Sequence, residues 1–366
     1  MADINYIQPD IDFIRQVKKE CGSSLTACMQ CGTCSVVCEL SPGDKPFPRK
    51  EMMWSAWGLK EKLYGDPDIW LCHQCGDCTT YCPRDVRPSE VLASLRYRSY
   101  MHYARPKFLG KLLGNPLLLP VVIAIPVIII LGILYLAGTT KIPEGEINYS
   151  KFFPHIYLNT SFLFLVILVF AGLFSGLRKF RLDMKNNMPG TKKNSILKSF
   201  IVALKDSLTH KDFKSCKAQK FRYSAHLLML FGFLILLMVT VVAIFAVVFD
   251  EYPLTLWHPA KIAGNIASVM LTAGCLIIIY QRIVNKDILG KSNYYDWFFI
   301  ISLLLLTLSG VLTEIARFQN WYSAYHIYFI HLVLVWIIII YMPYTKFGHF
   351  MYRLTALTYA HRINRR

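Results

Sequence analysis

The sequence predicts an all-α protein in two parts, a helical soluble head followed by a bundle of six membrane-spanning helices. Of its 366 residues, 54% are hydrophobic and 17% are charged, and the mean hydropathy of +0.38 is too apolar for one soluble globule. Nine of the eleven cysteines lie before residue 83. Residues 1–104 hold 12 Lys and Arg against 13 Asp and Glu, whereas residues 105–366 hold 28 against 10. Because the basic excess belongs to the apolar part, it indicates membrane topology rather than nucleic-acid binding.

The head, residues 1–104, is predicted from two cysteine repeats of identical spacing. Three thiolates separated by two residues can surround one [4Fe–4S] cubane, and in two-cluster ferredoxins the fourth cysteine of each run binds the other cubane. The repeats are Cys28-x2-Cys31-x2-Cys34-x3-Cys38 and Cys72-x2-Cys75-x2-Cys78-x3-Cys82. The pattern therefore predicts two clusters, one on Cys28, Cys31, Cys34 and Cys82 and the other on Cys72, Cys75, Cys78 and Cys38.

A pair of structural zinc sites is the competing interpretation, since CxxC pairs also bind zinc. Two copies of a four-cysteine run are rare in zinc sites, so the iron–sulfur interpretation is preferred. The segments 49–63 and 88–101 have helical patterns, which favours a helical two-cluster ferredoxin domain. CxxC runs in a chain without an N-terminal apolar signal segment indicate a reducing, cytoplasmic location for the head.

Six apolar stretches in residues 105–366 are long enough, at about 20 residues, to cross a bilayer. Basic residues gather in every second connection, above all in the basic loop 178–222, which holds 13 Lys and Arg against three Asp. The positive-inside rule therefore places both termini, the head and this loop on the cytoplasmic side of the inner membrane. The stretches run over about 116–138, 155–177, 223–249, 259–281, 297–316 and 325–344.

Within the basic loop, apolar residues recur at helical spacing from Ile196 to Leu208, with lysines between them. This pattern predicts an amphipathic helix. Such a helix either lies on anionic headgroups or packs on the soluble head, and the sequence leaves both positions open.

Histidines within the predicted spans are the candidate haem ligands, because ionisable side chains are costly in a membrane. His331 and His349 are 18 residues apart, which in a continuous helix is five turns, about 27 Å along one face. His226 opens the third span at a depth similar to that of His349. We therefore expect His226 and His349 to bind one haem b between two helices. The alternative is that each histidine is only hydrogen-bonded in a polar belt.

A second haem would use His331, whose partner is open between two candidates. His258 lies at the outer end of the fourth span, and His155 lies at the outer end of the second. Near His258, the Lys261 ammonium and the Asn265 amide stand at the same membrane edge. These groups predict either a quinol site beside a haem or an ordinary interfacial anchor. Four other histidines have no sequence feature that indicates a cofactor ligand: His73, His102, His210 and His361.

Both parts of the chain resemble known families. Residues 1–104, with their cysteine repeats, resemble the iron–sulfur C subunit of heterodisulfide reductases. Residues 105–366 resemble the membrane-bound E subunit of these reductases, which is itself similar to the gamma-type cytochrome b of nitrate reductase. The segment 331–350 (HLVLVWIIIIYMPYTKFGHF) is similar to the haem-bearing helix of that cytochrome through His331 and His349, and 225–233 (AHLLMLFGF) is similar to the partner helix through His226. On the partner helix, that cytochrome has a further histidine ten residues after the one that His226 matches. This chain has Leu236 at that position.

This order of fused parts is typical of the C subunit in the quinone-interacting membrane-bound oxidoreductase (Qmo) complexes of sulfate reducers. The resemblance covers nearly the whole chain. It implies cytoplasmic FAD-bearing and iron–sulfur partner subunits, a menaquinone pool as substrate, and adenylylsulfate reductase as the eventual electron acceptor.

Together these observations predict a membrane electron-transfer subunit, in which electrons pass between menaquinol, haem b (one or two) and two [4Fe–4S] clusters to a cytoplasmic flavoprotein. The sequence shows no acid–base pair, nucleophile or glycine-rich dinucleotide loop, so no catalytic residue is assigned. The competing functions are a heterodisulfide- or sulfite-pathway reductase complex built from the same parts, and a membrane redox sensor. Four aspartates are candidates for either an acidic docking face or solvated surface: Asp66, Asp68, Asp77 and Asp85.

Overall fold

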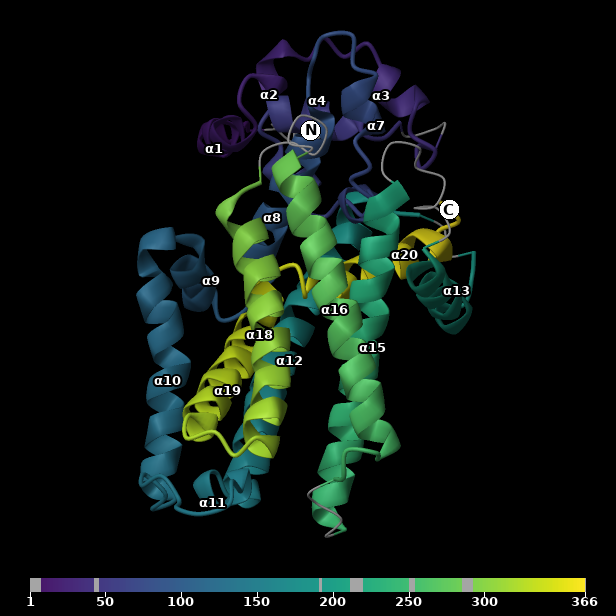
Figure 1. Ribbon diagram of the computed structural model, residues 1–366. Helices are drawn as coiled ribbons and strands as arrows, with labels where there is room; N and C mark the ends of the chain where they lie inside the picture. Colours follow the sequence, from purple (N-terminus) through teal and green to yellow (C-terminus); the bar gives the residue numbers. More distant parts are fainter. Residues whose placement is uncertain are drawn as a thin grey trace.

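The structure is a computed structural model that describes residues 8–42, 46–190, 193–210, 220–249, 254–284 and 292–365. Within these ranges the chain is helical and has no β-strand, which confirms the predicted all-α class. Six of the described helices are long and apolar enough to cross a membrane. Figure 1 shows these helices side by side, with the cysteine-containing head at one end of them.

The head is built from short helices, because the cysteine loops repeatedly interrupt the chain. α1 begins where the Asp10 carboxylate accepts a hydrogen bond from the Phe13 N–H at 2.8 Å, an N-cap that satisfies one of the free donors of the first turn. The longest helix, α8, begins with Pro88 at its first position and leads toward the membrane part. The helices are α1 (Ile11–Cys21), α2 (Ser24–Ala27), α3 (Thr33–Val36), α4 (Arg49–Ala56), α5 (Lys60–Tyr64), α6 (Asp68–Leu71), α7 (Asp77–Thr80) and α8 (Pro88–Tyr103).

The membrane part consists of the six long helices and the shorter helices that join them. Many large apolar side chains on the long helices are exposed, as surfaces that face lipid require. The long helices are α10 (Leu119–Leu136), α12 (His155–Asn187), α15 (Lys220–Val248), α16 (Pro259–Val284), α18 (Tyr294–Phe318) and α19 (Ala324–Tyr341). The shorter ones are α9 (Lys107–Gly114), η1 (Pro116–Leu118), α11 (Tyr149–Phe152), α13 (Ile196–Thr209), η2 (Met342–Tyr344) and α20 (His349–Arg362).

The last helical stretch is interrupted, so the expectation of one continuous helix from His331 to His349 is wrong. α19 is followed by the 3₁₀ turn η2, and α20 begins at His349 itself. Pro343 explains the break, because its ring has no N–H to continue the helical hydrogen bonds and clashes with the preceding turn. Figure 1 shows α20 turning away from α19 and running beneath the head. The two histidines are therefore not related by helical phase.

The basic 178–222 segment is helical over much of its described length, although the sequence indicated a loop. α12 continues to Asn187, ten residues beyond the predicted end of the second span. The amphipathic helix expected from Ile196 is present as α13, and it packs along α20 rather than on the cysteine-containing loops of the head. Residues 191–192 and 211–219 of this segment lie outside the described residues.

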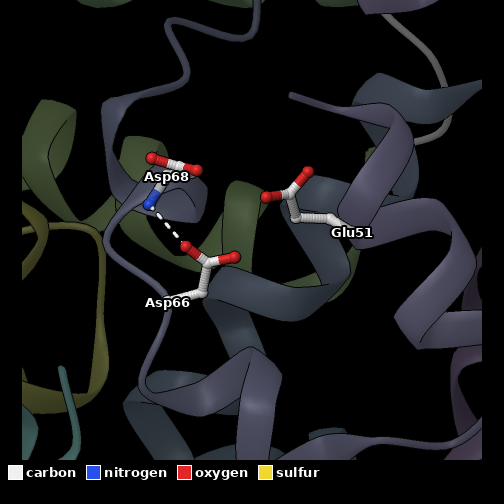
Figure 2. A group of neighbouring side chains, drawn as sticks. All are labelled: Glu51, Asp66 and Asp68. Carbon is white, nitrogen blue, oxygen red and sulfur yellow. Dashed lines mark hydrogen bonds between the residues drawn. The ribbon is translucent and has the colours of Figure 1, made fainter. Parts of the chain in front are cut away.

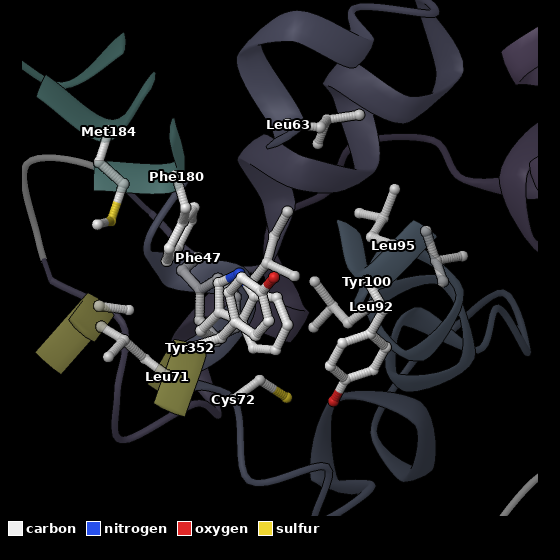
Figure 3. Close-up of a cluster of buried hydrophobic side chains, with 14 of the residues drawn as sticks. Phe47, Leu63, Leu71, Cys72, Leu92, Leu95, Tyr100, Phe180, Met184 and Tyr352 are labelled. Carbon is white, nitrogen blue, oxygen red and sulfur yellow. The ribbon is translucent and has the colours of Figure 1, made fainter. Parts of the chain in front are cut away.

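An aromatic core joins the head to the membrane part (Figure 3). Trp70 of α6 stacks on Tyr352 of α20, with ring centroids 4.8 Å apart. Phe180 of α12 contacts both rings edge-on, at centroid distances of 5.9 and 5.7 Å. These three side chains are at most 1% exposed. Because each buries a large apolar surface, the head is fixed on α12 and α20 rather than connected by a mobile linker.

Candidate metal centres

The structure gathers the eight motif cysteines into two groups, and each group lines its own cavity in the head. Each group contains three cysteines from one repeat and the last cysteine of the other repeat. The first group is Cys28, Cys31, Cys34 and Cys82, and the second group is Cys38, Cys72, Cys75 and Cys78.

The two cysteine loops have the same backbone conformation. Gln30 and Gln74 have φ angles of 59° and 55°, and Gly32 and Gly76 have φ angles of 87° and 92°. Such left-handed residues turn the backbone sharply, and glycine adopts them at no steric cost. The short helices α3 and α7 begin directly after the two glycines. Equal spacing in the sequence therefore produces equal loops around the two cavities.

The environment of the cysteines fits a metal cluster. Burial, the largest cause, together with neighbouring cysteines raises the pKa of the Cys34 thiol to about 11 and that of the Cys38 thiol to about 12. Buried thiols such as these release their protons when a metal supplies positive charge. Hydrogen bonds to sulfur are also in place: the Gln74 N–H donates to Cys72 Sγ at 3.2 Å, and Gln30 Nε2 donates to Cys28 Sγ at 3.4 Å. These contacts suit a cluster whose sulfurs accept hydrogen bonds.

The two groups differ in what covers them. Arginines from three helices bind backbone carbonyls of the segment from Trp70 to Gln74, which contains Cys72 of the second group. Arg96 of α8 donates to the Cys72 carbonyl at 2.8 Å, and Arg222 of α15 donates to the Gln74 carbonyl at 2.7 Å. Arg353 of α20 donates to the carbonyls of Trp70 and Leu71, each at 3.1 Å. In the first group, by contrast, Cys31 is exposed. The second group is therefore the one in contact with the membrane part.

The structure brings His226 and His349 together, with ring centroids 6.2 Å apart and ring planes nearly perpendicular. The His349 Nδ1–H donates to the Lys346 carbonyl at 2.6 Å, which fixes the tautomer and leaves Nε2 with its lone pair for a metal. Metal–nitrogen bonds are about 2 Å long, so this separation leaves room for one metal atom between two ring nitrogens. These two residues therefore fit the bis-histidine ligation of a haem iron.

Two histidines that carry no sequence signal also lie in this region. The His210 ring, at the end of α13, is 4.7 Å from the His226 ring. His73, next to Cys72, lies within 3.3 Å of the Arg353 guanidinium. His210 reaches this place through a segment with no recognisable motif, so only the three-dimensional fold reveals it.

The structure places the other predicted site residues apart from this pair. Ser309 on α18 donates to the Leu306 carbonyl, so the His331 Nδ1–H donates to Ser309 Oγ at 3.0 Å. His258 Nδ1 accepts from the Ala260 N–H at 3.2 Å and so caps its own helix. His155 is the first residue of α12. Of the candidate quinone residues on α16, Lys261 forms an ion pair with Glu314 of α18 at 3.1 Å, and Asn265 is exposed.

Three buried carboxylates form a further group in the head, shown in Figure 2. Glu51, Asp66 and Asp68 are at most 2% exposed, which excludes Asp66 and Asp68 from an acidic docking face. The Lys50 ammonium lies within 3.1 Å of all three, and Arg365 pairs with Asp68. The protein itself therefore supplies the positive charge that balances these carboxylates. Through its ion pair with Asp68, Arg365 also holds the C-terminal end of the described chain on the head.

We predict opposite outcomes for two substitutions in this group. Burial first, and the Asp66 charge next, raise the pKa of Glu51 well above its usual value, so Glu51 is held neutral and Glu51→Gln should change thermal stability little. Lys50→Met removes the common partner of three buried carboxylates and should cost about 3–5 kcal/mol. Thermal unfolding of the purified full chain measures both. A Glu51→Gln variant as unstable as Lys50→Met would contradict this prediction.

The same group gives a pH dependence with a defined sign. A carboxyl group whose pKa is higher in the folded chain binds more protons there than in the unfolded chain. The contribution of Glu51 to stability is therefore fully present below the ordinary glutamate value of 4.5 and is lost as pH rises from that value through the raised pKa of Glu51. Glu51→Gln should make this loss smaller.

Comparison with known proteins identifies the cysteine-containing domain. The family model of the 4Fe-4S dicluster domain matches residues 24–86. A protein of Archaeoglobus profundus that is like the C subunit of heterodisulfide reductase is 37% identical over 25% of this chain and 50% of its own length. The C subunit of the H(2):CoB-CoM heterodisulfide,ferredoxin reductase of Methanothermobacter marburgensis is 35% identical over 24% of this chain and 47% of its own length. The chain thus spans about half the length of these relatives, and the matches are the size of the head.

One relative matches across both parts. Citrate utilization protein B of Escherichia coli is 25% identical over 78% of this chain and 79% of its own length. No solved structure matches. The chain is therefore a multi-pass membrane protein with an iron–sulfur dicluster domain related to the C subunit of heterodisulfide reductases.

Proposed function

We propose that this chain is the membrane electron-transfer subunit of a quinone-dependent oxidoreductase complex. Electrons pass between menaquinol, a haem b on His226 and His349, and the two [4Fe–4S] clusters, and leave toward cytoplasmic FAD-bearing and iron–sulfur subunits. The cluster ligands are the two cavity groups, with Cys28, Cys31, Cys34 and Cys82 on one cluster and Cys72, Cys75, Cys78 and Cys38 on the other.

One observation carries this proposal: the helices that bear the two histidines also hold the second cysteine group. Arg222 precedes His226 by one helical turn on α15, and its guanidinium binds the Gln74 carbonyl. Arg353 follows His349 by one turn on α20 and binds the carbonyls just before Cys72. A redox centre between the histidines is thereby fixed next to the second cluster, and the exposed first cluster is the exit toward soluble partners.

The charges beside His349 support a haem rather than a bare metal ion. Lys346, whose carbonyl orients His349, and Arg282 share a single carboxylate, Asp296. Two cations on one anion leave one positive charge at a partly buried place, which the acidic propionates of a haem can neutralise. When bound, the haem supplies one-electron chemistry, while the chain orients its ligands and limits access of water.

The quinone side and the acceptor side are assigned by resemblance and charge. We place the head and the basic α12 end on the cytoplasmic side of the inner membrane, the menaquinone site in the membrane part, and adenylylsulfate reductase downstream. His331 is the candidate ligand of a second haem, with His258 or His155 as its partner. The matches to heterodisulfide reductase subunits favour a second candidate, in which a cytoplasmic heterodisulfide reductase is the partner.

A reduction experiment tests the proposal. The purified chain, in lipid nanodiscs and without oxygen, is treated with menadiol, and optical and EPR spectra are recorded. We expect a reduced b-type haem band followed by the EPR signals of reduced clusters. A haem that dithionite reduces but menadiol does not would refute the quinone step, and zinc in place of iron would refute the whole assignment. Adding CoM-S-S-CoB heterodisulfide or adenylylsulfate with each partner reductase separates the two acceptors.

Replacing Arg353 with glutamine should lower the potential of the second cluster only. A positive charge beside a cluster favours its reduced, more negative state, so its loss should shift the midpoint down by roughly 30–60 mV. Arg84 lines the cavity of the first group, so Arg84→Gln is the matched control and should shift the first cluster instead. EPR-monitored redox titration measures both, and equal shifts of the two clusters in both variants would contradict the assignment.

A further inference from the structure

α13 has an apolar face that no described part of the chain covers. Its packed face consists of small residues, because Ser199, Ala203 and Ser207 lie at four-residue spacing and are buried. The large apolar side chains point elsewhere: Leu197 is 65% exposed and Ile201 is 56% exposed. Ile196, Phe200 and Val202 are also exposed. This pattern is the reverse of a helix that packs by its apolar face.

The charges on α13 border this apolar face. Lys198 and Lys205 are exposed and lie on the same side of Ile201 around the helix axis, about 60° and 40° from it. Lysines in this position extend their stems along apolar surface and keep the ammonium groups in the headgroup layer. The helix therefore presents apolar side chains with a strip of positive charge beside them, as a helix that binds an anionic membrane surface does.

We propose that α13 lies in the headgroup layer of the membrane, with Leu197 and Ile201 at the acyl boundary and Lys198 and Lys205 on anionic lipid phosphates. Lipid is the expected occupant of this apolar face, because the fold places α13 next to the membrane. Figure 1 places α13 beside α20, alongside the head-proximal ends of the spanning helices, whose exposed apolar surfaces already require lipid. The surrounding 178–222 segment carries the densest positive charge in the chain, which suits anionic headgroups.

This position connects the membrane surface to the histidine pair. The His361 Nε2–H on α20 donates to the Asp206 carboxylate on α13 at 3.0 Å, so α13 braces the helix that begins with His349. At its C-terminus, α13 places His210 against His226. Lipid contact at α13 thus helps to hold both sides of the pair, and this inference about lipid does not depend on the proposed electron route.

Photocrosslinking in the intact chain tests the proposal. Ile201 is replaced with benzoylphenylalanine, the protein is placed in nanodiscs of phosphatidylcholine and phosphatidylglycerol, and adducts are identified by mass spectrometry after illumination. Phe245, exposed on α15, is the lipid-facing control site, and Val36, 86% exposed on α3 of the head, is the control away from lipid. We expect lipid adducts at positions 201 and 245 and none at position 36.

The charge is tested in the same background. With Lys198 and Lys205 intact, the fraction of phosphatidylglycerol among the adducts at position 201 should exceed its fraction in the nanodisc. The double variant Lys198→Glu/Lys205→Glu should abolish this excess at position 201 and leave the adducts at position 245 unaltered. Adducts at 245 without adducts at 201 would overturn the proposal. So would crosslinking of position 201 to a protein in native membranes, because the face would then be a subunit interface. Lipid adducts without phosphatidylglycerol enrichment would overturn its electrostatic part.

Discussion

A chain in which Cys34 is replaced with alanine is expected to keep one [4Fe–4S] cluster and lose the other. Cys34 belongs to the first cavity group, and a cubane needs four ligands. Non-haem iron should therefore fall from about eight to about four atoms per chain, while the EPR signal of the second cluster survives. Cys21→Ala is the matched control, since Cys21 is buried outside both cavities and its loss should leave iron unchanged.

The last cysteine of each repeat gives the sharper form of this prediction. Cys38 follows the first run in sequence but lines the second cavity. Cys38→Ala should therefore destroy the cluster on Cys72, Cys75 and Cys78 and spare the one that Cys34→Ala removes. The two variants should show complementary EPR spectra and potentials. If both variants lost the same cluster, each repeat would bind its own cluster, and the crossed assignment would be wrong.

The sequence was most informative where geometry is local. Three cysteines at fixed spacing have to surround a common centre, and the packing of α3 against α7 brings the two repeats together. Pro343 is a local signal for the break before His349, because proline ends a helix. The His226–His349 contact nevertheless forms, because η2 and α20 turn the chain back beneath the head.

Other features of the site have no local signature. Arg353 meets the carbonyl of Trp70 across 283 positions of sequence, and nothing around it distinguishes it from the other basic residues of the cytoplasmic end. His210 likewise has no local sequence feature that indicates its place. The acidic character of Asp66 and Asp68 indicated a surface position, whereas ion pairs with Lys50 and Arg365 allow these two residues to be buried. Tertiary pairing of charges decides these cases, and single-sequence patterns do not record it.

Replacing His349 with alanine should remove one haem b per chain, and His226→Ala should remove the same haem, because the two rings are 6.2 Å apart and are the proposed ligands of one iron. The pyridine haemochrome assay measures haem per chain. His326 is exposed on α19, so His326→Ala is the matched control and should retain all haem.

Two further histidine variants sharpen this result. His210→Ala should keep the haem and change only its midpoint potential, because the His210 ring is 4.7 Å from that of the proposed ligand His226, closer than the 6.2 Å that separates the proposed ligand pair. His331→Ala then decides the number of haems. If His349→Ala removes all haem, the chain has one haem, and His331 is a hydrogen-bonded histidine of α19. If haem remains in His349→Ala but is lost when His331→Ala is added, the chain has two. Full haem retention in His349→Ala would refute the pair, and with it the route from membrane to cluster through α15 and α20.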